Sequence, residues 1–360
     1  MNILHTETLK KWGGQQNRVL SEAVGLKQRK HKVIIACHKG SVLARKSHEA
    51  GLKVYEVNML KQAHLATIPR LIHIIKKENI DIVSTHSSVD SWAGGLAAKL
   101  SGRRLVRFRH NLFPIGKDPL TKLIYFLPDR IIAISNTVAS VLKECGMNSG
   151  KLSTIPDSVD PEIFAPEVTD IREELNIADD TIVIGNTSTF TQVKGQEDFL
   201  KAFNRIREKI NCILLFAGRL IEPSKSRYLS YVNKKYRDDV IFLGHRDDIP
   251  RVLNTIDIFV YPSILEGLGT ALLEAMIMGR PVAVSDIPTF KDFISDKING
   301  VYFRTGDPES IAEAVIMLIE NVPLREEIGS SARTTALDRF ALDRMIDLTE
   351  ACYLEVIDAE

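Results

Sequence analysis

The chain has 360 residues, of which 44% are hydrophobic and 26% charged, proportions typical of a globular protein with room for two domains. Its longest apolar runs are shorter than the about 20 residues of a membrane-spanning helix, and its four cysteines lack metal-site spacing, so no metal site is expected. No basic-then-apolar signal sequence begins the chain, so we expect a cytoplasmic protein with free thiols.

Charge is distributed unevenly along the chain. Residues 1–160 contain 25 Lys and Arg against 12 Asp and Glu, whereas residues 161–360 contain 22 against 34. A basic half and an acidic half indicate two domains with different partners, of which the first faces an anion. The alternative is that basic and acidic surfaces simply coexist. We expect no nucleic-acid partner.

Short apolar segments alternate with helical patterns in both halves. Strands are predicted near 2–6, 32–37, 53–58, 81–85, 104–109, 130–134 and 153–155. A polar, proline-marked linker at 153–170 precedes further strands near 181–187, 211–217, 239–242, 256–261, 281–285 and 300–303. This α/β alternation predicts two parallel sheets, each covered by helices on both faces.

Ligands of open parallel sheets bind at the carboxyl ends of the strands, so the two sheets are expected to face each other across a cleft. Cationic and histidine side chains that closely follow strands of the first half then lie on the cleft side. The predicted acceptor-binding residues are Lys10, Lys11, Lys39, Arg45, His86 and Arg109, and Lys46 and Lys61 also fall on this side. For His86, a structural hydrogen bond is the alternative.

The segment IDIFVYPSILEGLGTALLEAMIMGRP (256–281) predicts a buried strand, a glycine turn and a helix that ends at Gly279. The N–H groups and dipole at the start of such a helix favour a phosphate. Glu266 and Glu274 would repel a phosphate but accept hydrogen bonds from hydroxyl groups beside it, as a nucleotide sugar would offer. The alternative is that both glutamates only stabilise the helix dipole.

The segment PSILEGLGTALLEAMIMGRPVAVSDIP (262–288) resembles the signature of retaining glycosyltransferases of the GT-B fold, specifically the large family 4 of bacterial cell-surface polysaccharide and lipopolysaccharide enzymes. Other similar segments follow in order, among them WGGQQ (12–16), STHSSVD (84–90), RFRHN (107–111), QVKG (192–195) and FLGHRDDIPRVL (242–253). The resemblance implies two Rossmann-like, doubly wound domains: an acceptor-binding domain (1–160) and a nucleotide-sugar-binding domain (161–342). A C-terminal helix at about 343–360 would cross back to the first domain.

The resemblance also implies roles for individual residues. Glu266 would bind hydroxyl groups of the transferred sugar, Glu274 would bind the ribose, and Lys194 would neutralise the departing phosphate. His110 would contact the donor sugar, so His110, Glu266 and Lys194 are the expected catalytic residues. Further donor contacts are expected from Gly13, Gly14, Thr189, Arg219, His245, Arg246, Gly267, Leu268, Gly269 and Thr270.

Two features depart from the family pattern. Thr189 stands where an arginine commonly lies five residues before the phosphate-binding lysine, and Arg219 is a candidate replacement for that charge. The linker has Asp157 and Ser158 in place of the usual Asn-Gly pair.

Three hypotheses follow for the function. The first is a retaining transferase without cofactor or metal, passing a sugar from a UDP-sugar (alternatively a GDP- or ADP-sugar) to an anionic glycan or glycolipid such as lipopolysaccharide core. The stretch 64–77 would then rest on the cytoplasmic face of the inner membrane, or be an ordinary amphipathic helix. The second is a regulator that binds nucleotide sugars without transfer. The third is another GT-B enzyme, an epimerase or a phosphorylase.

Overall fold

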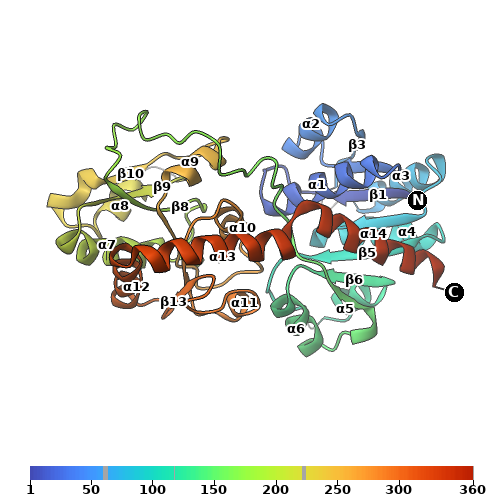
Figure 1. Ribbon diagram of the computed structural model, residues 1–360. Helices are drawn as coiled ribbons and strands as arrows, with labels where there is room; N and C mark the ends of the chain where they lie inside the picture. Colours follow the sequence, from blue (N-terminus) through green and yellow to red (C-terminus); the bar gives the residue numbers. More distant parts are fainter. Residues whose placement is uncertain (60–63, 117, 221–223, 360) are drawn as a thin grey trace. The chain divides into compact units, whose positions relative to one another are not determined.

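The computed structural model describes residues 1–59, 64–116, 118–220 and 224–359, so Lys61 lies outside the described residues. The chain divides into two units, one formed by Met1–Ser158 with Leu342–Glu360 and the other by Val159–Ala341 (Figure 1). Each unit is built around one parallel sheet.

The first unit contains a seven-stranded sheet in the order β3-β2-β1-β4-β5-β6-β7, with every pair of neighbours parallel. Its strands are β1 (Asn2–Glu7), β2 (Lys32–Cys37), β3 (Lys53–Glu56), β4 (Ile82–Thr85), β5 (Arg104–Arg109), β6 (Arg130–Ala133) and β7 (Leu152–Thr154). The strand order reverses between β1 and β4, which is where ligands bind in sheets of this type.

Helices cover both faces of this sheet. They are α1 (Gly14–Gln28), α2 (Val42–Glu49), α3 (His64–Lys77), α4 (Ser88–Leu100), α5 (Pro119–Phe126) and α6 (Asn136–Glu144). Side chains alternate along β1, so Ile3 joins the core beneath α1 while Leu4 joins the core beneath α3 and α4. The C-terminal helix α14 (Leu342–Asp358) lies against α1 and contributes Met345 and Tyr353 to the Ile3 core.

The second unit repeats this topology with a six-stranded sheet in the order β10-β9-β8-β11-β12-β13. Its strands are β8 (Ile182–Asn186), β9 (Cys212–Phe216), β10 (Val240–Phe242), β11 (Ile258–Tyr261), β12 (Val282–Ser285) and β13 (Val301–Phe303). Its helices are α7 (Gln196–Lys209), α8 (Ser224–Leu229), α9 (Ile249–Thr255), α10 (Thr270–Ile277), α11 (Pro288–Lys291), α12 (Pro308–Glu320) and α13 (Val322–Phe340). The order reverses between β8 and β11.

The prediction of two Rossmann-like parallel sheets is confirmed, and each strand expected from the sequence occurs. The ends of some strands differ: β3 ends at Glu56, two residues before its predicted end. This strand lies at the edge of the sheet and has a partner on one side only, β2. The predicted return of the C-terminal helix to the first unit is also observed.

The helix α3 does not leave its apolar face free. Leu71, Ile74 and Ile75 are buried in the core beneath it, which favours the alternative of an ordinary amphipathic helix over the sheet. Among the described residues, no helix is both long and apolar enough to cross a membrane. The four cysteines are free thiols, as expected.

Candidate active site

The carboxyl ends of β8 and β11 bring Lys194 against Glu266. Lys194 closes a short 3₁₀ turn after β8, and its ammonium group forms an ion pair with Oε1 of Glu266. The hydroxyl of Ser263 donates to the same oxygen at 2.7 Å, and the hydroxyl of Tyr261 lies 3.2 Å from Nζ of Lys194. Because β8 and β11 are neighbours at the reversal of strand order, this pair lies where a ligand is expected.

Two glycines allow the backbone to close around this pair. Gly195 has a φ of 67°, and a Cβ added there would lie 2.0 Å from the carbonyl oxygen of Pro262. The same two loops are joined by a hydrogen bond from the N–H of Ile264 to the carbonyl of Val193 at 2.8 Å. Gly269 has a φ of 96°, and a Cβ there would lie 3.1 Å from the ring of Tyr261. Any other residue at these two positions would be strained.

The helix α10 begins directly after this turn. Gly269 is its N-cap, with no side-chain cap, and Thr270 is its first residue. The first N–H groups of a helix have no partner within it, and together with the helix dipole they form an anion site. Gly267 and Thr270 are partly exposed, whereas Leu268 is buried. This geometry is consistent with a diphosphate bound by backbone N–H groups at 267–270.

The carboxyl group of Glu274 lies one turn further along α10. Burial raises the pKa of this carboxyl to about 8, and no described residue donates a hydrogen bond to it or pairs with it. Since no acidic residue occupies the first turn of α10 and Glu266 binds Lys194 and Ser263, neither glutamate acts as a helix cap. The alternative that the two glutamates cap the start of the helix is therefore not supported.

The loops after β8 and β9 bring Thr189 and Arg219 together. Both residues are exposed, and the N–H of Phe190 donates to the carbonyl of Arg219 at 3.3 Å. Arg219 therefore lies beside the position from which the family arginine is missing, which keeps it as the candidate replacement.

The loop after β10 contains His245 and Arg246, two of the predicted donor contacts. His245 is exposed, and the guanidinium of Arg246 pairs with Glu174 and with Asp248, each at 2.7 Å. The side chain of Arg246 is thus engaged within the protein, and its contact with the donor stays a prediction.

In the first unit, Glu7 organises the loop that leads to Gly13 and Gly14. Its buried carboxyl group accepts hydrogen bonds from the N–H of Thr8 at 2.7 Å and of Leu9 at 2.9 Å, and from Nε2 of Gln15 at 2.5 Å. Gly13 is the N-cap of α1 in an extended conformation, and both glycines are exposed. They thus lie open to a ligand at the carboxyl end of β1.

His110 directly follows β5 and continues a stack of rings. Its ring centroid lies 5.6 Å from that of His86 and 5.8 Å from that of Phe108. Burial, with smaller contributions from Arg18 and Arg109, lowers the pKa of His110 to about 3. His110 is therefore a neutral side chain at physiological pH.

His86 is only 3% exposed. Its Nε2 lies 3.1 Å from Nδ1 of His5, and its ring stacks on Phe108 at 4.7 Å. The structure thus places His86 in an internal hydrogen bond, which favours the structural alternative over direct contact with an acceptor.

Four of the five predicted acceptor-binding cations lie at the ends of β1, β2 and β5, and the fifth, Arg45, lies in α2. Lys10 and Lys39 are exposed, and the N–H of Val42 donates to the carbonyl of Lys10 at 3.1 Å, which joins the two loops. Lys11 and Arg45 are also exposed, although Arg45 pairs with Glu49 at 2.8 Å. The guanidinium of Arg109 instead donates to Tyr125 at 2.6 Å and to carbonyl groups of its own loop.

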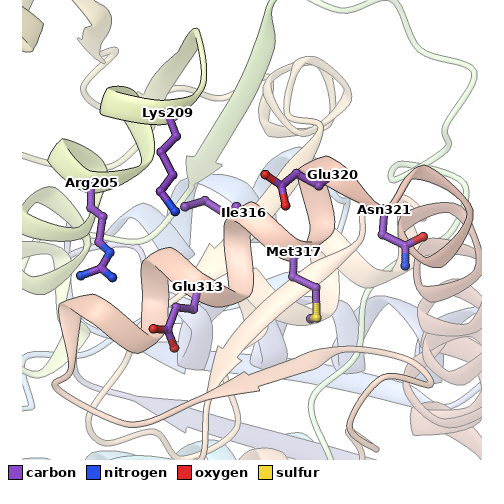
Figure 2. Close-up of a pocket in the computed structure, with 7 residues that line it drawn as sticks. All are labelled: Arg205, Lys209, Glu313, Ile316, Met317, Glu320 and Asn321. Carbon is purple, nitrogen blue, oxygen red and sulfur yellow. The ribbon is translucent and has the colours of Figure 1, made fainter.

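A surface groove of about 490 Å³ lies elsewhere in the second unit, between α7 and α12 (Figure 2). It is lined by Arg205, Lys209, Glu313, Ile316, Met317, Glu320 and Asn321. None of these residues belongs to the predicted site, and none lies at the carboxyl end of a strand, where ligands of parallel sheets bind. Among the described residues, no group of His, Cys, Asp and Glu is arranged to hold a metal ion.

Among the residues of these clusters that were not selected from the sequence are Glu7, His5, Tyr261 and Ser263. Ser263 is close to Glu266 in the chain, so its hydroxyl is the one that sequence reasoning had a signal to find. Glu7 and His5 lie in a strand with no motif around them, and Tyr261 has the pattern of an ordinary core residue.

Comparison with known proteins identifies relatives for both units. Residues 12–163 match the model described as Glycosyltransferase Family 4, and residues 167–335 match the model described as Glycosyl transferases group 1. The chain is 26% identical to an N-acetyl-alpha-D-glucosaminyl L-malate synthase of Bacillus anthracis, over 86% of this chain and 84% of the relative.

Two further similarities extend over most of the chain. It is 29% identical to an Escherichia coli UDP-Gal:alpha-D-GlcNAc-diphosphoundecaprenol alpha-1,3-galactosyltransferase, over 80% of this chain and 78% of the relative. It also matches the solved structure of Anabaena Alr3699/HepE in complex with UDP, with a TM-score of 0.85, 18% identity and coverage of 99% and 100% of the two chains.

Proposed function

Because the chain belongs to the family 4 and group 1 glycosyltransferases and is thus a sugar transferase, we propose that it moves a sugar from a nucleotide diphosphate to a hydroxyl group of an anionic acceptor, with retention at the anomeric carbon. The observation that carries this proposal is the Lys194–Glu266 pair, beside the start of α10. Together, the pair and the start of α10 bring a cation, helix N-terminal N–H groups and a carboxylate that can accept hydrogen bonds from hydroxyl groups into one place.

The second unit supplies the groups that a nucleotide sugar requires. Lys194 and the first N–H groups of α10 would bind the diphosphate and stabilise the negative charge that grows on it as the glycosidic bond breaks. Glu266 would accept hydrogen bonds from the transferred sugar, and Glu274 from the two ribose hydroxyl groups. Burial raises the pKa of Glu274, and the ribose hydroxyl groups would give its carboxyl group the hydrogen-bond donors that no described residue supplies.

We propose same-face displacement as the reaction. The bond between the anomeric carbon and the phosphate oxygen breaks, and the acceptor oxygen bonds to that carbon on the face the phosphate leaves. The acceptor proton passes to the departing phosphate oxygen. Lys194 and the helix start carry the charge in this scheme, so that no metal ion is required, and the protein acts by positioning and electrostatic stabilisation.

For the donor we propose a UDP-sugar, with GDP- and ADP-sugars as the alternatives. The support comes from similar proteins: a relative has UDP-Gal in its name, and a protein of the same fold was solved with UDP.

The acceptor is proposed to be anionic. Residues 1–160 are strongly basic, and Lys10, Lys11 and Lys39 are exposed at the ends of β1 and β2. The names of two relatives contain an anionic compound each, L-malate and a diphosphoundecaprenol-linked sugar. We favour a glycolipid or lipopolysaccharide-core sugar, which would bring the chain to the cytoplasmic face of the inner membrane.

The test is to incubate the protein with UDP-, GDP- and ADP-sugars, with and without diphospholipid-linked acceptors, and to follow release of the free nucleotide. Lys194→Met and Glu266→Gln should strongly slow the release that the wild type shows, whereas Lys201→Met, which changes an exposed lysine of α7, should not. Binding of a donor without turnover, even with acceptors, would favour the alternative of a nucleotide-sugar-binding regulator.

A further inference from the structure

A series of buried polar side chains in the first unit, which we call the histidine relay, connects Tyr353 to His110 through Glu22, His5 and His86. It starts at Tyr353 of α14, whose hydroxyl donates to Oε1 of Glu22 in α1 at 2.7 Å. The same oxygen lies 3.8 Å from Nε2 of His5 in β1. Nδ1 of His5 lies 3.1 Å from Nε2 of His86, and Nδ1 of His86 lies 3.4 Å from Nε2 of His110. Four of these five residues lie outside the predicted catalytic set.

The three histidines are neutral. Burial lowers the pKa of His5 and of His110, and lowers the pKa of His86 well below its usual value. A neutral imidazole has one nitrogen that donates and one that accepts. The neighbours of each ring therefore decide which of its two nitrogens carries the proton.

Glu22, at the inner end of the histidine relay, favours one direction for the hydrogen bonds between the histidines. The carboxylate of Glu22, paired with Arg18 at 3.0 Å, places a negative charge 3.8 Å from Nε2 of His5. This nitrogen has no hydrogen-bond partner among the described residues, and the charge favours the proton of His5 there rather than on Nδ1. Nδ1 of His5 is then an acceptor, and the facing Nε2 of His86 must donate to it. The hydroxyl oxygen of Ser84, 3.3 Å from the same Nε2, can also accept from it and is compatible with this assignment.

The tautomer of His110, at the outer end of the histidine relay, follows from this assignment. With its proton on Nε2, His86 presents Nδ1 as an acceptor, and the facing Nε2 of His110 donates to it. Nδ1 of His110 is then left with a lone pair. This nitrogen is buried and has no hydrogen-bond partner among the described residues. An unsatisfied buried acceptor is costly, and a hydroxyl group of a ligand would remove that cost.

We propose that Glu22, His5 and His86 are positioning residues that hold His110 in the tautomer protonated at Nε2, so that Nδ1 accepts a hydrogen bond from a hydroxyl group of the sugar substrate. This inference rests on the proposed function, since it gives His110 a defined role in binding the sugar. It also gives α14 a part in the site: the hydroxyl of Tyr353 contacts both Glu22 and Ser84, the latter at 3.0 Å.

The first test reads the tautomer itself. The chain has nine histidines, and selective ¹⁵N labelling of their rings in the full-length protein, with His110→Gln to assign one set of signals, resolves which nitrogen of His110 is protonated. We expect a protonated Nε2 and an unprotonated Nδ1 in the wild type without ligand. A proton on Nδ1 would overturn the proposal.

The second test interrupts the histidine relay by a substitution at His86. His86→Phe keeps a ring to stack on Phe108 but removes both nitrogens, so we expect a mixture of His110 tautomers and a kcat about tenfold lower, the scale of one lost hydrogen bond. An unchanged tautomer or an unchanged kcat in this variant contradicts the relay.

A milder pair of variants covers the case in which His86→Phe does not fold. Tyr353→Phe removes the hydroxyl group that begins the histidine relay and should shift part of the His110 population to the other tautomer. Tyr236→Phe, which changes a buried tyrosine of the second unit, should not. Equal ring spectra for the two variants would count against the proposal. If the wild type transferred no sugar at all, the proposed function would fail, while the ring spectra would still decide whether the relay sets the tautomer.

Discussion

Lys194 and Glu266 form an ion pair across 72 positions of the chain, and each is held by a different loop. The side chain of Glu266 is 9% exposed and accepts a further hydrogen bond from Ser263, so its carboxylate is fixed before any ligand arrives. Such fixed charges stabilise a transition state without the cost of reorganising at the moment of reaction. Four predictions follow from this site.

The first concerns the charge on Lys194. Replacing it by Met removes the cation expected to stabilise the departing diphosphate, so kcat should fall by roughly 10²–10³, the range seen when a preorganised stabilising group is lost. Lys194→Arg should retain more activity than Lys194→Met. The measurement is kcat at saturating donor, with Lys201→Met as the matched control. A Lys194→Met enzyme within a factor of two of the control would refute this role.

The second concerns protons taken up or released with the donor. The pKa of Glu274 is about 8, so its carboxyl group is mostly protonated at pH 7 in the free protein. Two ribose hydroxyl groups that donate to it favour the ionised form, and donor binding should therefore release up to about one proton. Calorimetry in two buffers of different ionisation enthalpy measures this number. Equal release by wild type and Glu274→Gln would show that another group is responsible.

The third concerns stability of the free protein. Above the usual carboxyl pKa of 4.5, Glu274 ionises in the unfolded chain but stays protonated in the folded one. The unfolded state then binds fewer protons, so the free energy of unfolding should fall as the pH rises from about 5 to 8, by at most about 1.4 kcal/mol per pH unit. The side chain of Glu274 is partly exposed to solvent, which reduces the shift of its pKa and therefore the total fall in stability. Denaturation at several pH values should show a shallower fall for Glu274→Gln; parallel curves would argue against the shifted pKa.

The fourth concerns Gly195. An alanine there combines a left-handed φ with a Cβ 2.0 Å from the carbonyl oxygen of Pro262, so the loop bearing Lys194 must move. Gly306 also has a positive φ, but nothing lies within 4 Å of its Cβ position. Gly306→Ala should cost about 1 kcal/mol of stability, and Gly195→Ala distinctly more, with loss of activity. Similar unfolding midpoints for the two variants would mean that the close approach is relieved at little cost.

Much of the fold could be predicted because its signals are local. The apolar run at 256–261, the glycine turn and the helix that ends at Gly279 are each encoded by neighbouring residues, and they are found as β11, the turn and α10. Glu266 and Glu274 lie in this one segment, so their separation is fixed by the turn and helix alone. The spacing between them is thus a property that the sequence expresses directly.

The relationships within the candidate site are of a different kind. Lys194 meets Glu266 only because β8 and β11 are neighbours in the sheet, and no local pattern specifies that neighbour. His86, predicted as an acceptor-binding residue, is instead buried between His5, Phe108 and His110. These side chains come from three strands, β1, β4 and β5, or directly follow them, so their contacts depend on strand order and on which face each side chain takes.

The sequence by itself determined the strand and helix segments, the basic and acidic halves, and the segment with two glutamates, because propensity, periodicity and charge act between residues close in the chain. The tertiary structure alone decided that Lys194 pairs with Glu266, that burial raises the pKa of Glu274, and that Tyr353 of the last helix contacts Glu22 beside the histidines of the first sheet. Such contacts arise when burial of the whole core fixes the order of the strands. Only then do burial and hydrogen bonding give distant side chains their chemistry.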